Sequence, residues 1–215
     1  MPLPPLTQIP PQIACAADYE AYARERMEEA AWAYLAGGAA DELTLRANRE
    51  AYERVRIQPR VLTSMAGGGT ALDLLGLRLP YPILLAPVAY QKLAHPQGEL
   101  ATVLAASAMK AAMVVSTQAS IALEELARTA ETPLWFQLYL QPDRNDTLHL
   151  VRRAEAAGYR ALVVTVDAPV NGVRNREQRA GFSLPTGVEA VNLRGMRPMA
   201  QAVARAGESA LFGSG

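Results

Sequence analysis

A threonine, an acid and two arginines follow one short apolar run of the sequence. The run Ala161–Val164 is followed by Thr165 and Asp167, and the next loop carries two arginines, of which Arg174 is the first. Pro169 has no N–H for a strand ladder, so a strand is expected to end before it. A carboxylate at the carboxyl end of a strand, with arginines in the following loop, is the arrangement of an α/β active-site rim. A solvated strand end fits these residues equally well, because fold analogy does not fix function.

Three earlier apolar runs, at 83–86, 113–115 and 134–136, also lead into polar or aromatic side chains. The residues that follow them are, in order, Tyr90 with Gln91, Ser116 with Thr117 and Gln118, and Gln137 with Tyr139. Parallel strands place their carboxyl ends at one edge of a sheet, so these residues predict one ligand-binding rim. Polar capping for solubility would explain one or two such runs, but it explains four poorly.

Helical stretches are expected between these runs, near 98–110, 122–130 and 145–157. Gly158 is a natural stop for the last of them. An alternation of short strands and helices predicts successive βαβ crossovers and a parallel sheet. The fold class is therefore α/β.

The amino-terminal part has a different pattern. Asp18 is a plausible cap for a helix that runs to about Ala36 and is ended by Gly37 and Gly38, and a second helix is expected from Asp41 to Tyr52. Four segments are expected: a proline-rich tail (1–17), a helical segment (18–80), the strand and helix repeats (81–190), and a long mobile loop after the fourth strand (191–215).

Composition excludes several classes of function. Of the 215 residues, 21 are Lys or Arg and 21 are Asp or Glu, so no overall field favours nucleic acid. Cys15 is the single cysteine and there are two histidines, so neither an internal disulfide nor a metal site is expected. The longest apolar run, 83–90, is far shorter than the ~18 residues of a membrane span. No basic region precedes an apolar one at the N-terminus, so a cytoplasmic protein is expected.

A set of motifs between about Asp18 and Leu184 resembles one family, in order and with compatible spacing. The matching stretches are Tyr34–Ala39, Thr44–Arg49, Pro59–Arg60, Pro82–Pro87, Gln91–Glu99, Phe136–Tyr139, Asp143–Arg144 and Thr165–Pro169. Together they resemble the FMN-dependent 2-hydroxy acid oxidases and dehydrogenases, which include glycolate oxidase, lactate oxidase and mandelate dehydrogenase. The resemblance implies a (β/α)8 TIM barrel, of which this chain would supply the N-terminal helical segment and about four βα units.

The resemblance also implies roles for single residues. Tyr34 and Arg174 would bind the substrate carboxylate, which the planar guanidinium matches with two hydrogen bonds. Tyr139 would hydrogen-bond near the substrate hydroxyl. Asp167 would act with Tyr139 in catalysis by orienting a histidine and raising its basicity. The flavin ring would be lined by Pro87, Val88, Ala89, Ser116, Gln137 and Thr165.

The implied reaction is oxidation of an (S)-2-hydroxy acid to a 2-oxo acid, with FMN as the redox group. In the family the histidine base and the phosphate-binding loops lie in the second half of the barrel, and this chain is expected to lack them. His95 and His149 are not expected to replace that base. The implied partners are a 2-hydroxy acid, the second barrel half (from the same precursor or another chain) and further copies in a homo-oligomer, commonly a tetramer.

Alternatives to this enzyme half stay open. A non-catalytic or truncated half-barrel would serve as an assembly partner or as a flavin-binding module. A flavodoxin-like doubly wound domain would need a phosphate loop after the first strand, for which residues 89–93 are a poor candidate. The residues Tyr90, Gln118 and Ala168 depart from common family patterns, so glycolate, lactate and arylglycolates all remain possible substrates.

Overall fold

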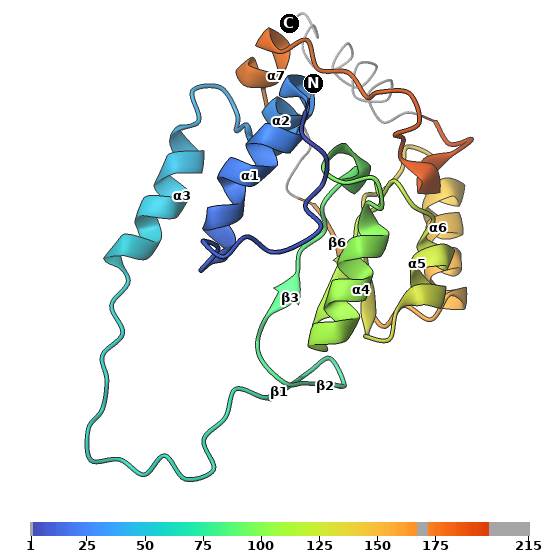
Figure 1. Cartoon of the computed structure of the whole chain (residues 1–215). Coiled ribbons are helices and arrows are strands. Elements are labelled where there is room, and N and C mark those ends of the chain that lie inside the picture. Colours follow the sequence, from blue (N-terminus) through green and yellow to red (C-terminus); the bar gives the residue numbers. More distant parts are fainter. Residues whose placement is uncertain (1, 167–171, 198–215) are drawn as a thin grey trace, which may run out of the picture. The chain divides into compact units, whose positions relative to one another are not determined.

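The computed structural model describes residues 2–166 and 172–197 (Figure 1). The chain forms two compact units. Unit 1 comprises residues 1–69, 93–95 and 171–186, and unit 2 comprises residues 70–92, 96–170 and 187–215. Each α-helix and each β-strand of the structure lies within one unit, and the two units are described one after the other.

Unit 2 contains a short hairpin and a parallel sheet. The antiparallel hairpin pairs β1 (Leu72–Leu74) with β2 (Leu77–Leu79). The parallel sheet has the order β3-β4-β5-β6, with bounds Leu84–Leu85, Ala112–Val115, Leu134–Leu138 and Leu162–Val164. These strands coincide with the apolar runs of the sequence, and the predicted parallel sheet is confirmed.

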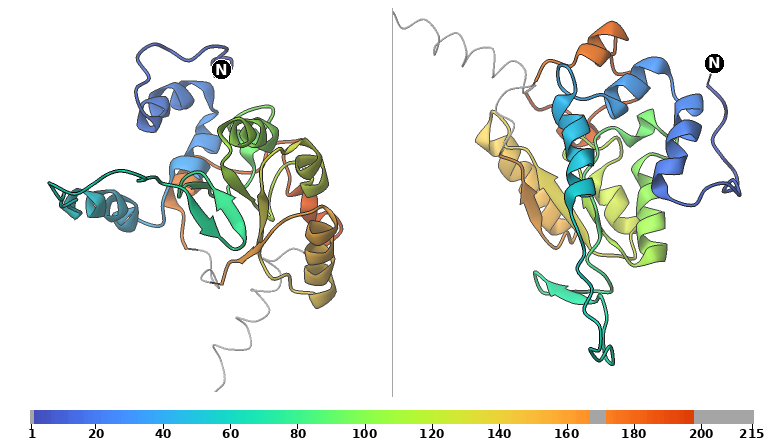
Figure 2. Two further views of the ribbon diagram at one scale, coloured as in Figure 1. Left: turned by 90° about the horizontal axis from the view of Figure 1, so that it is seen from below. Right: turned by 90° about the vertical axis from the view of Figure 1, so that its left-hand side faces the viewer.

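The helices α4 (Glu99–Met109), α5 (Leu123–Thr129) and α6 (Arg144–Ala156) connect these strands. They follow one another along one face of the sheet (Figure 2). Sequential strand order with every crossover on one face is the pattern of a barrel, whereas a doubly wound sheet reverses its order and carries helices on both faces. Within the described residues, the structure therefore favours part of a (β/α)8 barrel over a flavodoxin-like domain.

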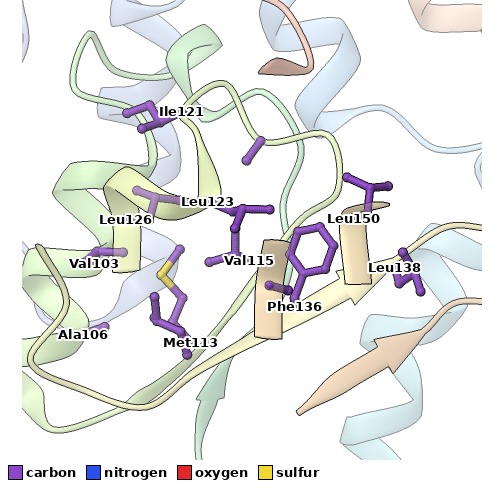
Figure 3. Close-up of a cluster of buried hydrophobic side chains, with 13 residues drawn as sticks. Val103, Ala106, Met113, Val115, Ile121, Leu123, Leu126, Phe136, Leu138 and Leu150 are labelled. Carbon is purple, nitrogen blue, oxygen red and sulfur yellow. The ribbon is translucent and has the colours of Figure 1, made fainter. Parts of the chain in front are cut away.

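The core of unit 2 lies between this sheet face and the helices. Met113 and Val115 of β4 and Phe136 and Leu138 of β5 alternate along their strands and face the helices, where they meet side chains such as Leu150 (Figure 3). Phe136 is fully buried and meets the ring of Tyr159 edge-on at 5.8 Å between centroids. Alternate residues of β4 and β5 therefore face the other side of the sheet, so packing in this core also fixes how the polar residues at the strand ends are aimed.

Gly158 ends α6 with a φ of +86°, as expected for a glycine after a helix. Tyr159 then turns back and donates a hydrogen bond from its hydroxyl to the carbonyl of Leu123 (2.9 Å). The turn thus brings the chain directly into β6.

In unit 1 the prediction of one continuous helix between Asp18 and Ala36 is wrong. This unit has α1 (Tyr19–Arg26) and α2 (Glu29–Ala36), separated by Met27 in an extended conformation (φ −116°, ψ 143°). Met27 is only 8% exposed. No glycine or proline marks this break, so burial of the side chain, a tertiary effect, overrides the local helix propensity.

Asp18 stands directly before α1, at the predicted cap position, but its side chain makes no hydrogen bond to that helix. Its Oδ2 accepts hydrogen bonds from the amides of Ala14 (2.8 Å) and Cys15 (2.9 Å), and so closes the short 3-10 turn Ala16–Asp18. These hydrogen bonds hold the pKa of the Asp18 carboxyl below its ordinary value.

The helix α2 ends at Ala36 before Gly37, as expected, and α3 (Leu43–Arg54) follows. The predicted Asp41 cap is wrong, because the residue that precedes α3 is Glu42, with a φ of +59°. The carboxylate of Glu42 instead accepts a hydrogen bond from the amide of Gly38 at 3.0 Å. It therefore braces the turn between α2 and α3.

The first residues of the expected loop 191–215 pack on unit 2. The amide of Val191 donates to the carbonyl of Ala119 (3.1 Å), and Leu193 and Met196 lie against the core. Asn192 is 1% exposed. The later part of that segment, 198–215, lies outside the described residues.

Candidate cofactor and substrate sites

Three predicted flavin-lining residues of unit 2 form one hydrogen-bonded group at the carboxyl ends of β4, β5 and β6. Gln137 is at its centre and is 3% exposed. The side-chain Oε1 of Gln137 accepts from the amide of Thr117 (3.1 Å) and from Ser116 Oγ (3.4 Å), and its Nε2 donates to Thr165 Oγ1 (3.0 Å). Residues 116, 137 and 165 are thus brought together as the strand pattern predicts.

Thr117 extends this group; the sequence pattern placed it in the rim but assigned it no role of its own. Its hydroxyl donates to the carbonyl of Gln137 (2.5 Å) and accepts from the amide of Tyr139 (3.2 Å). Thr117 is fully buried, so this hydroxyl fixes the backbone of β5 where the strand ends. The available signal was the polar run 116–118 directly after an apolar strand.

Tyr139 lies just after β5 and is half-buried. Its carbonyl accepts a hydrogen bond from Gln141 Nε2 at 2.8 Å. The backbone of Tyr139 is therefore held on both its N–H and C=O sides, while its hydroxyl makes no hydrogen bond within the described part of the chain. A fixed backbone with an available phenol suits the predicted contact with a substrate hydroxyl.

The segment Pro87–Ala89 follows β3 at the same edge of the sheet. Pro87 and Val88 are exposed, Val88 by 43%, and Ala89 is half-buried. Tyr90 comes next with a φ of +52°, which is uncommon for a residue with a side chain. Its amide donates to the carbonyl of Gln118 (3.1 Å). Burial raises the pKa of the Tyr90 hydroxyl.

In unit 1 the two predicted carboxylate-binding residues are in contact. The guanidinium carbon of Arg174 lies 5.9 Å from the centre of the Tyr34 ring, and Nη2 donates to the Tyr34 carbonyl at 2.6 Å. Phe182 stacks on the same ring, with centroids 4.6 Å apart and planes 15° from parallel. Residues 140 positions apart thus form one cationic and aromatic cluster.

Acidic partners orient the arginines of this cluster, and no sequence pattern predicted them. Glu177, one turn along α7 (Asn175–Arg179), pairs with Nε of Arg174. Arg176 donates to Glu42 Oε2 at 2.7 Å, and so fastens α7 to the turn that precedes α3. Nε faces the acid and Nη2 donates to the Tyr34 carbonyl, while Nη1 makes no hydrogen bond within the described part of the chain, so its N–H groups stay available to an acceptor.

The sequence also singled out Asp167, Ala168 and the two histidines. Asp167 and Ala168 lie outside the described residues. His149 is exposed on α6, and His95 is half-buried in a loop. In residues 2–166 and 172–197, no three His, Cys, Asp or Glu side chains are grouped to hold a metal ion. Over the same residues, no helix has the length and apolar character to cross a membrane.

Comparison with known proteins gives a consistent set of relatives. The chain is 45% identical over 208 residues to an L-lactate oxidase of Alicycliphilus denitrificans, a match that covers 97% of this chain and 57% of that protein. It is 46% identical over 176 residues to a 4-hydroxymandelate oxidase of Amycolatopsis orientalis, covering 82% and 49%. It is 40% identical over 179 residues to glycolate oxidase 3 of Arabidopsis thaliana, covering 83% and 48%. The chain thus spans about half the length of the curated relatives it matches.

Solved structures agree with these relatives. A mandelate oxidase variant with (S)-mandelic acid superposes with a TM-score of 0.80 at 41% identity, over 90% of this chain and 57% of that one. A second, with a C4a-OH-FMN adduct, has a TM-score of 0.79 at 41% identity, over 89% and 58%. The sequence profile described as FMN-dependent dehydrogenase matches residues 23–211. This chain therefore belongs to the FMN-dependent dehydrogenase family.

Proposed function

We propose that this chain supplies one half of the flavin and substrate site of an oxidoreductase that converts an (S)-2-hydroxy acid to a 2-oxo acid. The observation that carries the proposal is the buried hydrogen-bonded group centred on Gln137, which joins the ends of adjacent strands in a chain of this family. The relatives are named as lactate, glycolate and 4-hydroxymandelate oxidases, and these names support the proposed class of substrate.

The side chains at this edge fit FMN. Gln137, Ser116 and Thr165 offer a neutral amide and two hydroxyls, which match the uncharged nitrogen and oxygen atoms along one edge of a flavin ring. The Gln137 amide has two N–H groups, one of which donates to Thr165, while the other has no partner in the described part of the chain. A buried donor without a partner is costly, and a flavin oxygen or nitrogen would satisfy it. FMN, when bound, supplies the acceptor for the two electrons of the oxidation.

The protein residues would bind and orient the substrate. Arg174 and Tyr34 are proposed to hold the substrate carboxylate, since the N–H groups on Nη1 of Arg174 can donate to an anion while Nη2 is held by the Tyr34 carbonyl. Tyr139 is proposed to hydrogen-bond with the substrate hydroxyl. Asp167 is proposed to orient a histidine base that lies outside this chain, and to favour its protonated form when it takes the hydroxyl proton.

The exposed edge of the sheet supports a partner that completes the barrel. On β6 and directly after it, Leu162, Val164 and Val166 are 42%, 47% and 80% exposed. Leu162 and Val164 are in register with Phe136 and Leu138, which face the helices, so their exposed side chains call for a further helix. β6 is also the last strand of the sheet within the described residues, so its backbone edge calls for a neighbouring strand. We propose that the second half of a barrel completes this edge, and that the completed protein is a homo-oligomer, as the family resemblance implies, located in the cytoplasm.

Anaerobic reduction of bound flavin tests this function. The chain would be co-expressed with the part of the Alicycliphilus denitrificans L-lactate oxidase that it does not match, and FMN would be added. We expect (S)-lactate, glycolate or (S)-mandelate to bleach the visible absorption of the oxidised flavin, and (R)-lactate to leave it unchanged. An assembly that binds FMN but is bleached by none of these acids would contradict the proposal and favour a non-catalytic flavin-binding module.

A further inference from the structure

Glu99 is a fully buried acid of unit 2 to which the proposed reaction gives no role. It is the first residue of α4, and its exposed fraction is 0%. Its position in the first turn of a helix favours a negative group. Burial of a carboxyl group is unfavourable unless hydrogen bonds replace water, so its partners show what the residue does.

The partners of Glu99 come from two different loops at the carboxyl edge of the sheet. From the loop after β3, the amide of Gln91 donates to Oε1 (3.1 Å). From the loop after β4, the amide of Ser120 donates to Oε1 (2.9 Å) and its hydroxyl lies 2.8 Å from Oε2. One carboxyl group therefore joins the two loops that carry Pro87–Ala89 and Ser116.

Further contacts make this junction tight. Ser120 Oγ also accepts from the amide of Lys92 (3.1 Å). Thr102, one turn along α4, donates to the side-chain oxygen of Gln91 at 2.5 Å. Gly98 has a φ of +49°, and a Cβ there would lie 2.9 Å from the Cγ of Lys92. The loop after β3 is thus fastened along its backbone to the start of α4.

We propose that Glu99 is a positioning residue that holds the loop after β3 in the conformation that receives the flavin. This inference rests on the proposed function, in which the backbone of Pro87–Ala89 lines the flavin ring. That segment ends at Tyr90, whose left-handed backbone conformation must be held from outside. The hydrogen bond from Tyr90 to Gln118 and those from Gln91 and Lys92 to the junction at Glu99 supply that constraint.

The hydrogen bonds of the junction use Glu99 as an acceptor. The groups that bond to it from the two loops are the amides of Gln91 and Ser120 and the hydroxyl of Ser120, all of which donate. A carboxylate has only acceptor positions, whereas an amide turns one of its two ends into a donor. The change Glu99→Gln therefore keeps the size of the side chain and loses acceptors for the loop.

The first test is hydrogen exchange of the 215-residue chain, measured by mass spectrometry without flavin. In Glu99→Gln we expect the amides of 90–92 and 119–120 to exchange about 10- to 150-fold faster, the equivalent of one hydrogen bond to a charged group. Exchange in α6 should not change. The matched control is Glu125→Gln, which alters an exposed glutamate of the next helix. Unchanged exchange at 90–92 in Glu99→Gln would overturn the proposal.

The second test is FMN binding to the assembly of this chain with the lactate oxidase part, followed by flavin fluorescence. In Glu99→Gln we expect the dissociation constant of FMN to rise about 10-fold or more, and the visible absorption bands of flavin bound at saturation to shift. Equal affinity and equal bands would overturn the proposal. Should the unchanged chain itself fail to bind FMN, the proposed function is wrong, while the exchange test still decides on the loop.

A second variant covers the case in which Glu99→Gln does not fold. Ser120→Ala keeps the carboxyl group and both amide donors but removes the hydroxyl that links Lys92 to Glu99. Faster exchange confined to Lys92 and its neighbours would support the proposal. Exchange equal to that of the unchanged chain would contradict it.

Discussion

At the scale of single residues, Gln137 and Arg174 show two ways of preparing a binding group. Gln137 is buried and has its oxygen fully used by protein donors, so its amide orientation is set and one N–H remains for a ligand. The side chain of Arg174 is 36% exposed, its Nε forms an ion pair with Glu177 and its Nη2 donates to the Tyr34 carbonyl, which leaves the N–H groups on Nη1 for an anion. The first arrangement suits a neutral ring, and the second suits an anion.

The first prediction concerns Arg174. In the completed enzyme, Arg174→Leu should lower kcat/KM for a 2-hydroxy acid by about 10- to 150-fold, the loss of a charged hydrogen bond worth about 1.5–3 kcal/mol. A substrate amide, which lacks the carboxylate charge, should lose much less. Steady-state kinetics with the acid and the amide would measure both.

The matched control is Arg128→Leu, which removes an exposed arginine of α5. It should leave both substrates unaffected. An equal loss for the acid and the amide in Arg174→Leu would argue against a contact between this guanidinium and the carboxylate.

The sequence predicted these residues unequally. Thr165, Gln137 and Ser116 follow apolar runs, so strand periodicity alone placed them at one edge. The pair Tyr34 and Arg174 was reached only through the family resemblance, because no local pattern connects residues so far apart. Several buried hydrogen-bonding residues were missed, since their partners are mostly backbone amides and carbonyls that no side-chain pattern reveals: Glu99, Ser120 and Asn192.

At the scale of elements, a remote residue caps the helix α5. The residue before α5 is Ala122, which has no capping side chain, and Asn192 Oδ1 instead accepts from the amide of Leu123 at 3.0 Å. Arg153 of α6 donates to the carbonyl of Asn192 (3.0 Å) and to Glu124 (2.7 Å). The segment 191–196 is therefore fastened to both helices.

The second prediction is that Asn192→Ala lowers the free energy of unfolding by about 1–3 kcal/mol, because it leaves a buried amide of α5 without an acceptor. Urea denaturation followed by circular dichroism would measure the change. Asn145→Ala, at an exposed position of α6, should change stability by less than about 0.5 kcal/mol. Equal stability of both variants would contradict the capping role.

The third prediction concerns the contact between Glu42 and Arg176. The amide of Gly38 and then the charge of Arg176 hold the pKa of Glu42 below its ordinary value of 4.5. A carboxyl with a depressed pKa stabilises the folded state above its unfolded-state pKa, and this contribution is lost as pH falls through the folded-state value. Glu42→Gln should therefore be less stable than the unchanged chain at pH 7, and the difference should shrink below about pH 4.5.

Chemical denaturation at a series of pH values would check this. The control is Glu50→Gln, which changes an exposed glutamate of α3. Its difference from the unchanged chain should stay small at every pH. A difference for Glu42→Gln that grows as pH falls would have the wrong sign for this account.

Element boundaries were predicted well where glycine or strand patterns mark them, and poorly in unit 1. Gly37 and Gly158 end helices as expected. The break at Met27 and the start of α3 after Glu42 depend on what their side chains contact in the folded chain, so local sequence could not show them.

At the scale of the whole molecule, β6 is the last strand of the sheet within the described residues. The sequence pattern predicted a parallel sheet and the family resemblance implied a barrel, but neither could show how far the side chains of this strand are exposed. Exposed apolar edge strands are sites of unwanted association. We therefore propose that β6 forms the seam to the second half of the barrel.

The fourth prediction follows from this edge. Val164→Lys should reduce self-association of the 215-residue chain in sedimentation velocity, and should weaken its assembly with the lactate oxidase part, because a charge cannot be buried cheaply at the seam. Leu104→Lys, at a position of similar exposure on α4, should affect neither. Normal assembly of Val164→Lys would contradict this role of the edge.

The central claim is that the group centred on Gln137 receives FMN, and FMN titration of the assembled protein tests it most directly. Flavin fluorescence would be followed for the unchanged chain, for Gln137→Leu and for the exposed control Gln58→Leu, with circular dichroism to confirm that each is folded. The account predicts that the unchanged chain and the control bind FMN equally, and that Gln137→Leu binds it about 10-fold or more weakly. Equal binding by Gln137→Leu, or no binding by the unchanged chain, would contradict it.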